Sequence, residues 1–381
     1  MDNLTHSLVG LSLSKAGLER VSPYATTVCL LSANAADADF VALFFGDRWT
    51  LLHHHRGITH SIVGTIAIGL LVPLLLALIE RTMARVRRRA PTIRLRSLMV
   101  ASLIAAATHP LMDWTNNYGV RPLLPWSGRW FYGDLVYIID PYIWLMLGAV
   151  MFLLTSKGRL RMFAWAVLAS ISTTLIVLAS IRGGTDASAL RILLVTWIAG
   201  MIAVVVVRAT GLYQRLNHRA ALAALALVLT YWGGLAVAHH SAYAFALAKA
   251  NQLANSRGET IVKVASMPMA ATPFRWQSVA ETDRAIYRYP SAVTGDDRAM
   301  DISRVGRFEK PTGRAAELVS IAERDRRAQE FLLFARFPIA VPEPSDCIGQ
   351  ALVQFADIRY TEPGAARGAF SVNVPVDCPA R

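Results

Sequence analysis

Residues 61–96 read SIVGTIAIGLLVPLLLALIERTMARVRRRAPTIRLR, an apolar run over residues 61–79 followed by an arginine-rich segment over residues 81–96. A helix needs about 20 apolar residues to cross the hydrocarbon core of a bilayer, so the first part predicts a transmembrane helix. Short loops rich in Lys and Arg stay on the cytoplasmic side during insertion. The stretch therefore predicts an integral membrane protein and its orientation.

Apolar runs of this kind recur through the first two thirds of the chain. The clearest are residues 61–79, 97–111, 137–155, 163–181, 192–207 and 221–238, and two weaker segments, 4–18 and 24–45, precede them. The first segment lacks the basic start and the cleavage site of a signal peptide, so we expect it to be retained. The predicted fold is mainly α: a polytopic helical membrane bundle of about eight helices, some short, followed by a small α+β extramembrane domain.

The charge distribution favours membrane flanks over a nucleic-acid surface. The chain is 54% hydrophobic and 17% charged, whereas roughly a quarter of the residues in soluble domains are charged. Its net charge of +13 is uneven, because the first 245 residues hold 21 Lys/Arg and 10 Asp/Glu, and residues 246–381 hold 18 and 16. We therefore expect membrane lipids, and no nucleic acid, as partners.

Alternation of the spans from the arginine-rich loop places the other basic loops on the same inner side. These loops carry Lys157, Arg159 and Arg161, and Arg208, Arg215 and Arg219. The same alternation sends residues 46–60, residues 114–136 and the chain after about residue 240 outward. We expect a multi-pass protein whose C-terminal domain faces the periplasm or the cell exterior.

The predicted domains are a membrane domain, residues 1–245, and an extramembrane domain, residues 246–381. Alternating apolar residues predict strands at 261–265, 285–289, 351–360 and 370–374, and residues 315–334 have helical spacing with a charged opposite face. Cys347 and Cys378 fall in an oxidising compartment where a disulfide would form, and two unpaired buried thiols are the alternative. Cys29, within an apolar run, is expected to pack.

Six ionisable side chains of metal-ligand type stand in or beside predicted spans, where such groups are costly and usually face a protein-lined cavity. They are His6, Asp37, Asp39, His60, His109 and Asp113. If residues 4–18 and 24–39 form a helical hairpin that turns near Pro23, all six reach the outer level of the bundle. The sequence therefore predicts a metal site that opens at the outer surface of the bilayer.

The spacing of these residues indicates how they are presented. His109 and Asp113, at positions i and i+4, share one helix face, as two ligands of one metal require. Asp37 and Asp39, at i and i+2, cannot share a face, so we expect them at a helix end or a turn.

Imidazole and carboxylate ligands suit Zn²⁺, with Mn²⁺ and Fe²⁺ as alternatives, and the lack of nearby thiolates argues against a structural cysteine site. Six ligands leave one or two metals open, and a metal pair can activate water and stabilise the leaving oxygen in phosphoester hydrolysis. Arg56 is predicted to clamp a phosphate oxygen, and an unligated Asp37 or Asp39 would serve as the general base. Asn34 and Thr59 would support the ligands from outside.

The remaining histidines are less informative. His55 stays open between a metal ligand and a substrate contact, and His53 and His54 are interpreted as loop residues. The three histidines His218, His239 and His240 lack the pattern and are excluded.

The ordered set of Thr5-His6, Asp37-x-Asp39, the string from His55 to Ser61 (HRGITHS) and His109-x-x-x-Asp113 resembles the bacterial inner-membrane metal-dependent hydrolases of the YdjM-like or DUF457 family. The resemblance covers roughly residues 1–155, and the HRGITHS string is its most specific part. It implies a place in the bacterial inner membrane and a ligand set of Asp37, Asp39, His60, His109 and Asp113, joined by His6. Ala36 departs from the proline that these sequences often have before the acidic pair.

Two functions from different classes follow. The first is an integral membrane metal-dependent hydrolase that cleaves a phosphoester or another ester, with small-molecule or lipid-linked substrates. Its catalytic residues would be Asp37, Asp39 and Arg56, and its cofactor a divalent metal, zinc first. The alternative is a non-catalytic membrane protein, for transport or partner binding, in which the same cluster is a structural metal site.

Overall fold

A computed structural model of the chain describes residues 1–182, 187–270, 272–293, 305–344, 349–364 and 370–378. The chain folds into two compact units. Unit 1 comprises Met1–Ala38, Arg56–Val237 and Pro268–Pro273, and unit 2 comprises Asp39–His55, Ala238–Met267 and Phe274–Arg381. The predicted boundary at residue 246 falls inside a long helix that runs from unit 1 into unit 2.

Unit 1 is helical. Its helices are α1 (Asn3–Lys15), α2 (Ala25–Asn34), α4 (Ile62–Val86), α5 (Leu95–Trp114), α6 (Pro141–Thr155), α7 (Arg159–Arg182), α8 (Ala187–Ala209) and the first part of α9 (His218–Asn255), with short 3-10 segments η1 (Leu18–Arg20), η3 (Ile58–His60) and η4 (Leu212–Arg215). Within the described residues, six segments are long and apolar enough to cross a membrane: Ala25–Phe44, Ile62–Val86, Leu95–Trp114, Arg159–Leu178, Ser188–Ala209 and His218–Asn255. These findings confirm the predicted helical membrane bundle.

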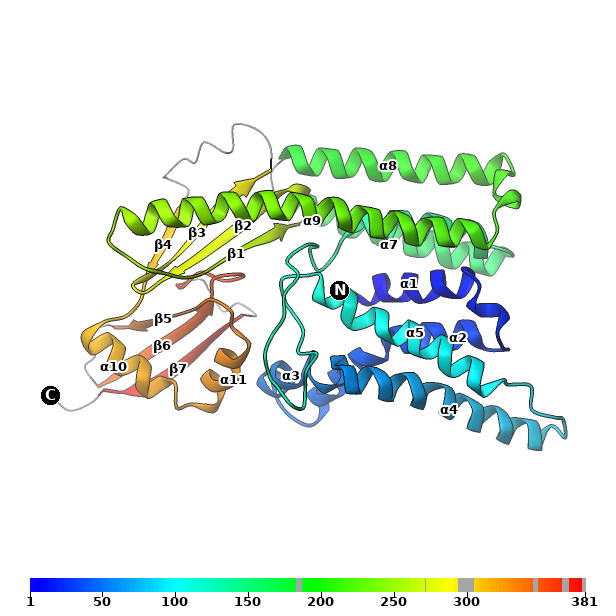
Figure 1. Cartoon of the computed structure of the whole chain (residues 1–381), viewed down its shortest axis with the longest axis horizontal. Coiled ribbons are helices and arrows are strands. Elements are labelled where there is room, and N and C mark those ends of the chain that lie inside the picture. The colour runs from blue at the N-terminus through cyan, green and yellow to red at the C-terminus, as the bar shows by residue number, and fades with distance from the viewer. Residues whose placement is uncertain (183–186, 271, 294–304, 345–348, 365–369, 379–381) are drawn as a thin grey trace. The chain divides into compact units, whose positions relative to one another are not determined.

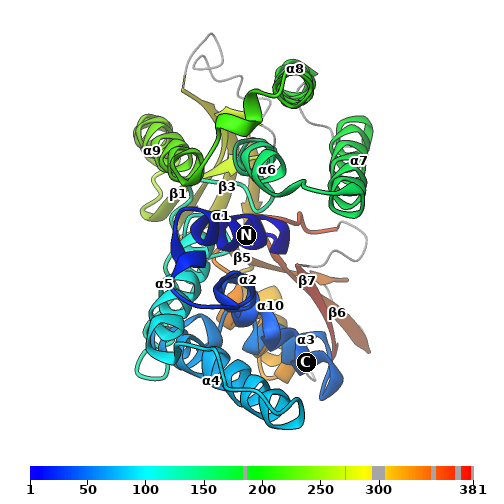
Figure 2. The same ribbon diagram turned by 90° about the vertical axis from the view of Figure 1, so that its right-hand side faces the viewer.

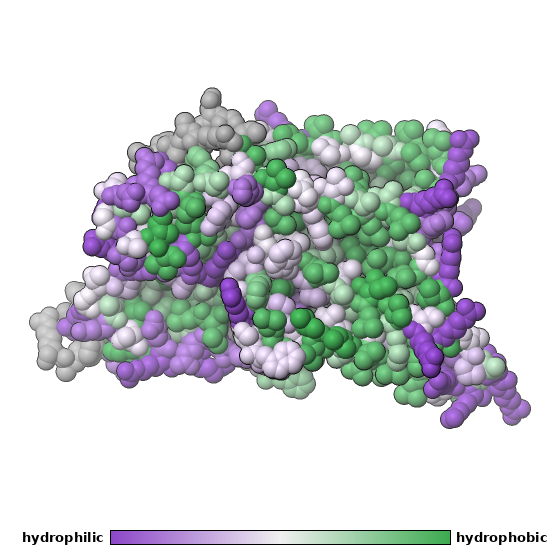
Figure 3. Space-filling model, viewed as in Figure 1, coloured by the Kyte–Doolittle hydropathy of each residue, from purple (hydrophilic) through white to green (hydrophobic). Residues whose placement is uncertain are grey.

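The surface of unit 1 is that of a protein immersed in hydrocarbon. Along α4, the large side chains of Leu71, Leu75 and Leu78 are 56–61% exposed, whereas the small Gly69 is buried. A Cβ atom at Gly69 would lie 2.4 Å from a side-chain atom of Leu103 on α5, so the glycine lets the two helices approach closely. Small residues at helix contacts and large apolar residues facing outward are typical of membrane proteins, and Figure 3 shows the apolar surface that results.

The helix ends of unit 1 divide into two groups. Helices α1 and α4 begin, and α2 and α5 end, at one end of the unit, and the arginine-rich loop between α4 and α5 lies at the other (Figure 1). The α6–α7 and α8–α9 connections also lie at this second end, which faces the viewer in Figure 2. All three basic loops of the sequence therefore share one end of unit 1.

Unit 2 is a small α+β assembly. One sheet has the order β1-β2-β3-β4 (Ile261–Met269, Thr272–Thr282, Ala285–Ala292, Gly306–Glu309), and the other has the order β5-β6-β7 (Pro338–Glu343, Gln350–Asp357, Ser371–Asp377). The pairs β2–β3, β3–β4, β5–β6 and β6–β7 are antiparallel. The predicted α+β domain is confirmed, although β2, β4 and β5 were not predicted.

The helical spacing of residues 315–334 is confirmed, and the structure divides the stretch into two helices, α10 (Gly313–Ala322) and α11 (Arg326–Phe334). The break lies at Asp325, whose carboxylate accepts a hydrogen bond from the backbone N–H of Arg327 and caps α11. Aspartate at this position favours a new helix start over a continuous helix.

A short helix from the N-terminal part of the sequence belongs to unit 2. Helix α3 (Arg48–His54) follows the 3-10 segment η2 (Ala35–Phe44) and contains His53 and His54, which were interpreted as loop residues. Trp49 on α3 is 6% exposed and packs in a core with Leu318, Phe331 and Phe355. Its burial ties residues 39–55 to unit 2.

The three cysteines differ in state. Cys29 is buried in α2 and free, as its apolar surroundings indicated. Cys378 is disulfide-bonded, and Cys347, its expected partner, lies outside the described residues.

Candidate metal centre

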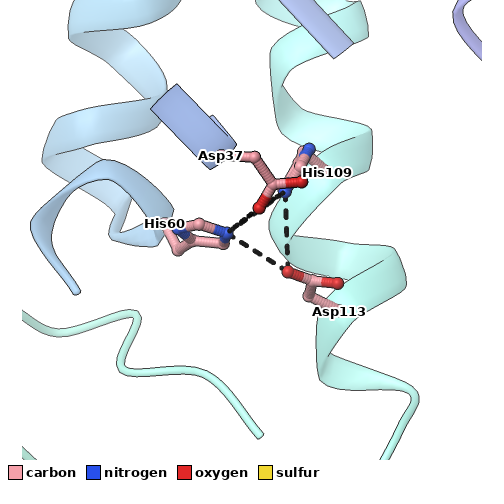
Figure 4. Close-up of side chains that lie close together, drawn as sticks. All are labelled: Asp37, His60, His109 and Asp113. Atoms are coloured by element: carbon pink, nitrogen blue, oxygen red, sulfur yellow. Dashed lines mark hydrogen bonds and ion pairs between the residues drawn. The ribbon is translucent and has the colours of Figure 1, made fainter. Parts of the chain in front are cut away.

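Four of the predicted ligands come together in unit 1. Asp37 lies in η2 just after α2, His60 ends η3 just before α4, and His109 and Asp113 occupy the last two turns of α5 (Figure 4). Each offers a ligand atom within 4.8 Å of the others, and none of the four residues is more than 9% exposed. A buried Asp/His cluster of this kind could hold a metal ion.

The distances within the cluster match the geometry of a single ion. The Nε2 atom of His60 lies 3.4 Å from Asp37 Oδ1 and 3.2 Å from Asp113 Oδ2. The Nε2 atom of His109 lies 3.5 Å from the same two oxygens and 3.1 Å from His60 Nε2. Four donors placed 2.0–2.2 Å from a zinc ion in a tetrahedron lie about 3.3–3.6 Å from one another. These five separations therefore fit two nitrogens and two oxygens around one ion.

The outer nitrogens of both imidazoles are held by neighbours. The Nδ1 atom of His109 lies 2.7 Å from the backbone carbonyl oxygen of Ala33, which can only accept, so Nδ1 carries the proton. The Nδ1 atom of His60 lies 3.0 Å from Thr59 Oγ1. Such contacts fix the ring orientation and leave Nε2 of His109 as a lone-pair donor toward the cluster, as metal-ligating histidines require.

Close packing at the start of α4 positions His60. Ser61 caps this helix by accepting a hydrogen bond from the backbone N–H of Gly64 at 3.1 Å. A Cβ atom at Gly64 would lie 1.9 Å from the carbonyl oxygen of Ile58, so only glycine allows η3 to fold against α4. His60 thereby ends its 3-10 turn in a buried position beside α5.

His6 stands directly beside the four ligands. Its ring stacks on His109, with centroids 3.7 Å apart and planes 10° apart, and its Nε2 atom lies 3.5 Å from Asp113 Oδ1. The side chain is fully buried, and neither ring nitrogen has a hydrogen-bond partner among the described residues. A buried polar group without a partner costs about 1–3 kcal/mol, so His6 is available as a further ligand. The α-amino group of Met1 also contacts Asp113.

Arg56 is held against the cluster. Its side chain is 4% exposed, and Nη2 lies 3.0 Å from Asp113 Oδ1. Nη1 donates to the Asn116 side-chain oxygen at 2.9 Å and the Gly119 carbonyl oxygen at 3.2 Å, and the guanidinium lies 4.5 Å over the Tyr118 ring. These contacts let Arg56 orient Asp113 and, together with the α-amino group of Met1, offset its charge. Asn116 and Tyr118 were not among the predicted residues, since neither carries a metal-ligand side chain.

Asp39 and His55 belong to unit 2 and pair with each other there. Asp39 Oδ1 lies 3.0 Å from His55 Nδ1, and the His55 ring lies 4.8 Å from Phe40. The other histidines lie elsewhere: His53 pairs with Glu330, and His239 contacts the backbone oxygen of Ser266.

Comparisons with known proteins identify relatives of the N-terminal half of the chain. The family described as YdjM inner membrane protein matches residues 1–184, which include all six predicted ligands. The chain is 32% identical over 132 residues to the inner membrane protein YbcI of Escherichia coli (strain K12), an alignment that covers 34% of this chain and 70% of that protein.

A second relative is the uncharacterized protein YfhP of Bacillus subtilis (strain 168), 24% identical over 152 residues. That alignment covers 38% of this chain and 43% of the relative, so the chain spans less than half of the relative's length. No solved structure matches. With the family match over residues 1–184 and a relative covered over 70% of its length, the chain belongs to the YdjM inner membrane protein family.

Proposed function

We propose that this protein is a membrane-embedded, metal-dependent hydrolase that cleaves a phosphoester or another ester. The observation that carries the proposal is the set of near-tetrahedral separations among Asp37, His60, His109 and Asp113. Two imidazoles and two carboxylates are a donor set that suits zinc, with Mn²⁺ and Fe²⁺ as alternatives.

A divalent ion held there would supply Lewis acidity, which lowers the pKa of water and polarises an ester or phosphoryl oxygen. The protein's own groups have distinct tasks beside it. Arg56 fixes the direction of the Asp113 carboxylate through its 3.0 Å contact. The Asp37 carboxylate, where it is not a ligand of the ion, would serve as the general base.

We place the proposed reaction at the outer face of the inner membrane, and the C-terminal domain in the periplasm. Two features support this orientation: the basic loops lie at one end of unit 1, and the ligands come from helix ends at the other (Figure 1). Basic loops stay in the cytoplasm. A site at the opposite membrane surface suits a small-molecule or lipid-linked substrate.

Metal content and turnover test the proposal together. Purified protein is expected to hold about one zinc, manganese or iron ion by elemental analysis, and to hydrolyse generic phosphodiester or ester substrates in a chelator-sensitive way. His109→Ala and Asp113→Ala should lose both properties, whereas His240→Ala, at an exposed position outside the cluster, should keep both. Chelator-insensitive turnover would reject the mechanism. Bound metal without any turnover would favour the structural-site alternative.

A further inference from the structure

We infer that a cavity inside unit 1 binds a hydrocarbon chain of a membrane lipid, and that this chain is the tail of the substrate. The second clause rests on the proposed function, whereas chain binding itself does not. The cavity has a volume of about 240 Å³ and is lined by residues of α1, α6, α7 and α8. Its wall includes Leu8, Trp144, Phe152, Trp165, Trp197 and Met201.

The lining offers almost no polar partner. The indole N–H groups of its three tryptophans donate hydrogen bonds of 2.9–3.0 Å to threonine hydroxyls that are not part of the lining. Trp144 donates to Thr5, Trp165 to Thr155 and Trp197 to Thr173. The tryptophans therefore contribute ring carbons, and Ser172 is the one lining residue with a hydroxyl group. A buried water needs two to four polar partners, so this space suits hydrocarbon better than water.

The cavity is in reach of the bilayer. Met162 on α7 and Val205 on α8 belong to its wall and are 42% and 62% exposed on the outside of unit 1. Around these helices the solvent is the acyl chains of lipids. A single chain can therefore enter sideways between helices without crossing water.

The shape of the cavity suits a chain that lies along the helices. On α6 the lining extends from Trp144 near the helix start to Phe152, about 12 Å at 1.5 Å per residue. On α1 it includes Leu4 and Leu8, which flank His6 in the sequence. These two residues stand two positions from His6 on either side, so they lie on the opposite face of α1, and this helix separates the cavity from the metal centre. Leu4 and Trp144 stand near the starts of α1 and α6, at the end of unit 1 from which the candidate ligands come, so a lipid with its tail here would have its polar end at that level of the bilayer.

One glycine allows the idea to be tested by filling the space. A Cβ atom at Gly148 on α6 would meet nothing nearer than Leu8 Cδ1 at 4.0 Å, although Gly148 belongs to the wall. A phenyl group at this position would occupy the cavity, and the helix itself gains from losing a glycine. Gly233 on α9 is the matched control, since it is exposed and a Cβ atom there would meet nothing within 4 Å.

The experiment is photolabelling in vesicles of phosphatidylethanolamine and phosphatidylglycerol that contain a trace of phosphatidylethanolamine with a diazirine in the middle of one chain. Labelled residues are mapped by mass spectrometry. Label on Trp197, which is 5% exposed, reports a chain inside the cavity, and label on Val195, which is 67% exposed, reports the surrounding bilayer. Gly148→Phe should lower the Trp197 label relative to Val195 about fivefold or more, because close-packed interiors have no spare room for a chain. Gly233→Phe should leave the ratio unchanged.

Three measurements decide the outcome: labelling, metal content and turnover. An unlabelled Trp197 in the unmodified chain, or an unchanged ratio in both Gly148→Phe and the smaller Gly148→Leu variant, overturns chain binding. Bound metal in Gly148→Phe should equal that of the unmodified protein, which shows that the metal centre has folded.

Where turnover is measured, Gly148→Phe should lower kcat/KM for a long-chain ester and not for a short water-soluble ester. An equal loss on both overturns the substrate-tail assignment, whereas absent turnover with the expected labelling rejects the hydrolase and supports the chain site.

Discussion

The imidazole rings of His6 and His109 lie stacked in the interior of unit 1, 3.7 Å between centroids and 10° from parallel. The two histidines differ in what surrounds them. His109 is anchored by the Ala33 carbonyl oxygen, whereas both ring nitrogens of His6 lack a hydrogen-bond partner among the described residues. Stacking explains where the His6 ring lies. It does not explain why the residue is a histidine, with two buried ring nitrogens, and not an apolar aromatic residue.

We predict that His6 contributes a nitrogen to metal binding. His6→Phe keeps an aromatic ring for the stack and removes both nitrogens, and should weaken metal affinity about 10- to 100-fold, as losses next to metal sites do. His6→Ala should weaken it at least as much. Titration calorimetry with Zn²⁺ measures the effect. Unchanged affinity in His6→Phe would show that the ring serves only for packing.

Arg56 is predicted to stabilise the metal-free protein. Its removal takes the guanidinium away from the buried Asp113 carboxylate, which keeps only the Met1 α-amino group as a cationic contact among the ion pairs of the described residues, and breaking a buried ion pair from one side costs about 3–5 kcal/mol. Arg56→Gln should therefore lower the unfolding temperature of the metal-free protein, and added Zn²⁺ should restore part of the loss. Thermal unfolding with and without metal measures this, with the exposed Arg161→Gln as control. Equal losses in both variants would contradict the assignment.

Gly64 is predicted to be intolerant of any side chain. Gly64→Ala places a Cβ atom 1.9 Å from the Ile58 carbonyl oxygen, so η3 has to move away from α4 and take His60 with it. We expect loss of bound metal together with lower thermal stability. Gly233→Ala, where the added carbon meets nothing within 4 Å, should retain both. Elemental analysis of the two purified variants is sufficient to decide.

Acid should weaken unit 2 through Glu259. Burial would raise the pKa of this carboxyl, but hydrogen bonds from Arg307, Thr282 and Tyr287 outweigh it and hold the pKa below its ordinary value. A carboxyl with a lowered pKa in the folded state contributes stability above its unfolded pKa of about 4.3, and that stability is lost as pH falls through the folded value.

Thermal unfolding of the full chain between neutral pH and pH 3 measures this contribution. Glu259→Gln should lower stability at neutral pH and flatten the dependence on acid, whereas the exposed Glu317→Gln should behave as the unmodified chain. An identical acid dependence in Glu259→Gln and the unmodified chain would show that the carboxylate adds nothing.

The membrane helices, and the meeting of four of the six candidate ligands, could be predicted because each follows from a simple rule. Apolar runs such as residues 61–79 are long enough to identify a span without tertiary information. His109 and Asp113 share a face because of helix periodicity, and in the structure both contact His60. Asp37 and Asp39 were expected at a helix end, and both lie in the 3-10 segment that follows α2.

Contacts between residues far apart in the chain could not be predicted from the sequence. Nothing local to Trp49 indicates that it packs with Phe331 and Phe355, since a tryptophan between two spans reads equally well as an interfacial residue. The same holds for Arg56, which was predicted to clamp a phosphate oxygen and which in the structure contacts Asp113, Asn116 and Gly119.

Burial of Trp49 has a consequence for how the ligands are held. The chain leaves unit 1 after Ala38, one residue beyond Asp37, and returns at Arg56, four residues before His60. Two of the four candidate ligands, Asp37 and His60, therefore lie close to the two ends of a segment, residues 39–55, that packs in the core of unit 2 through Trp49 of α3. Removal of the C-terminal fold would expose Trp49 to solvent and leave residues 39–55 without the core against which they pack.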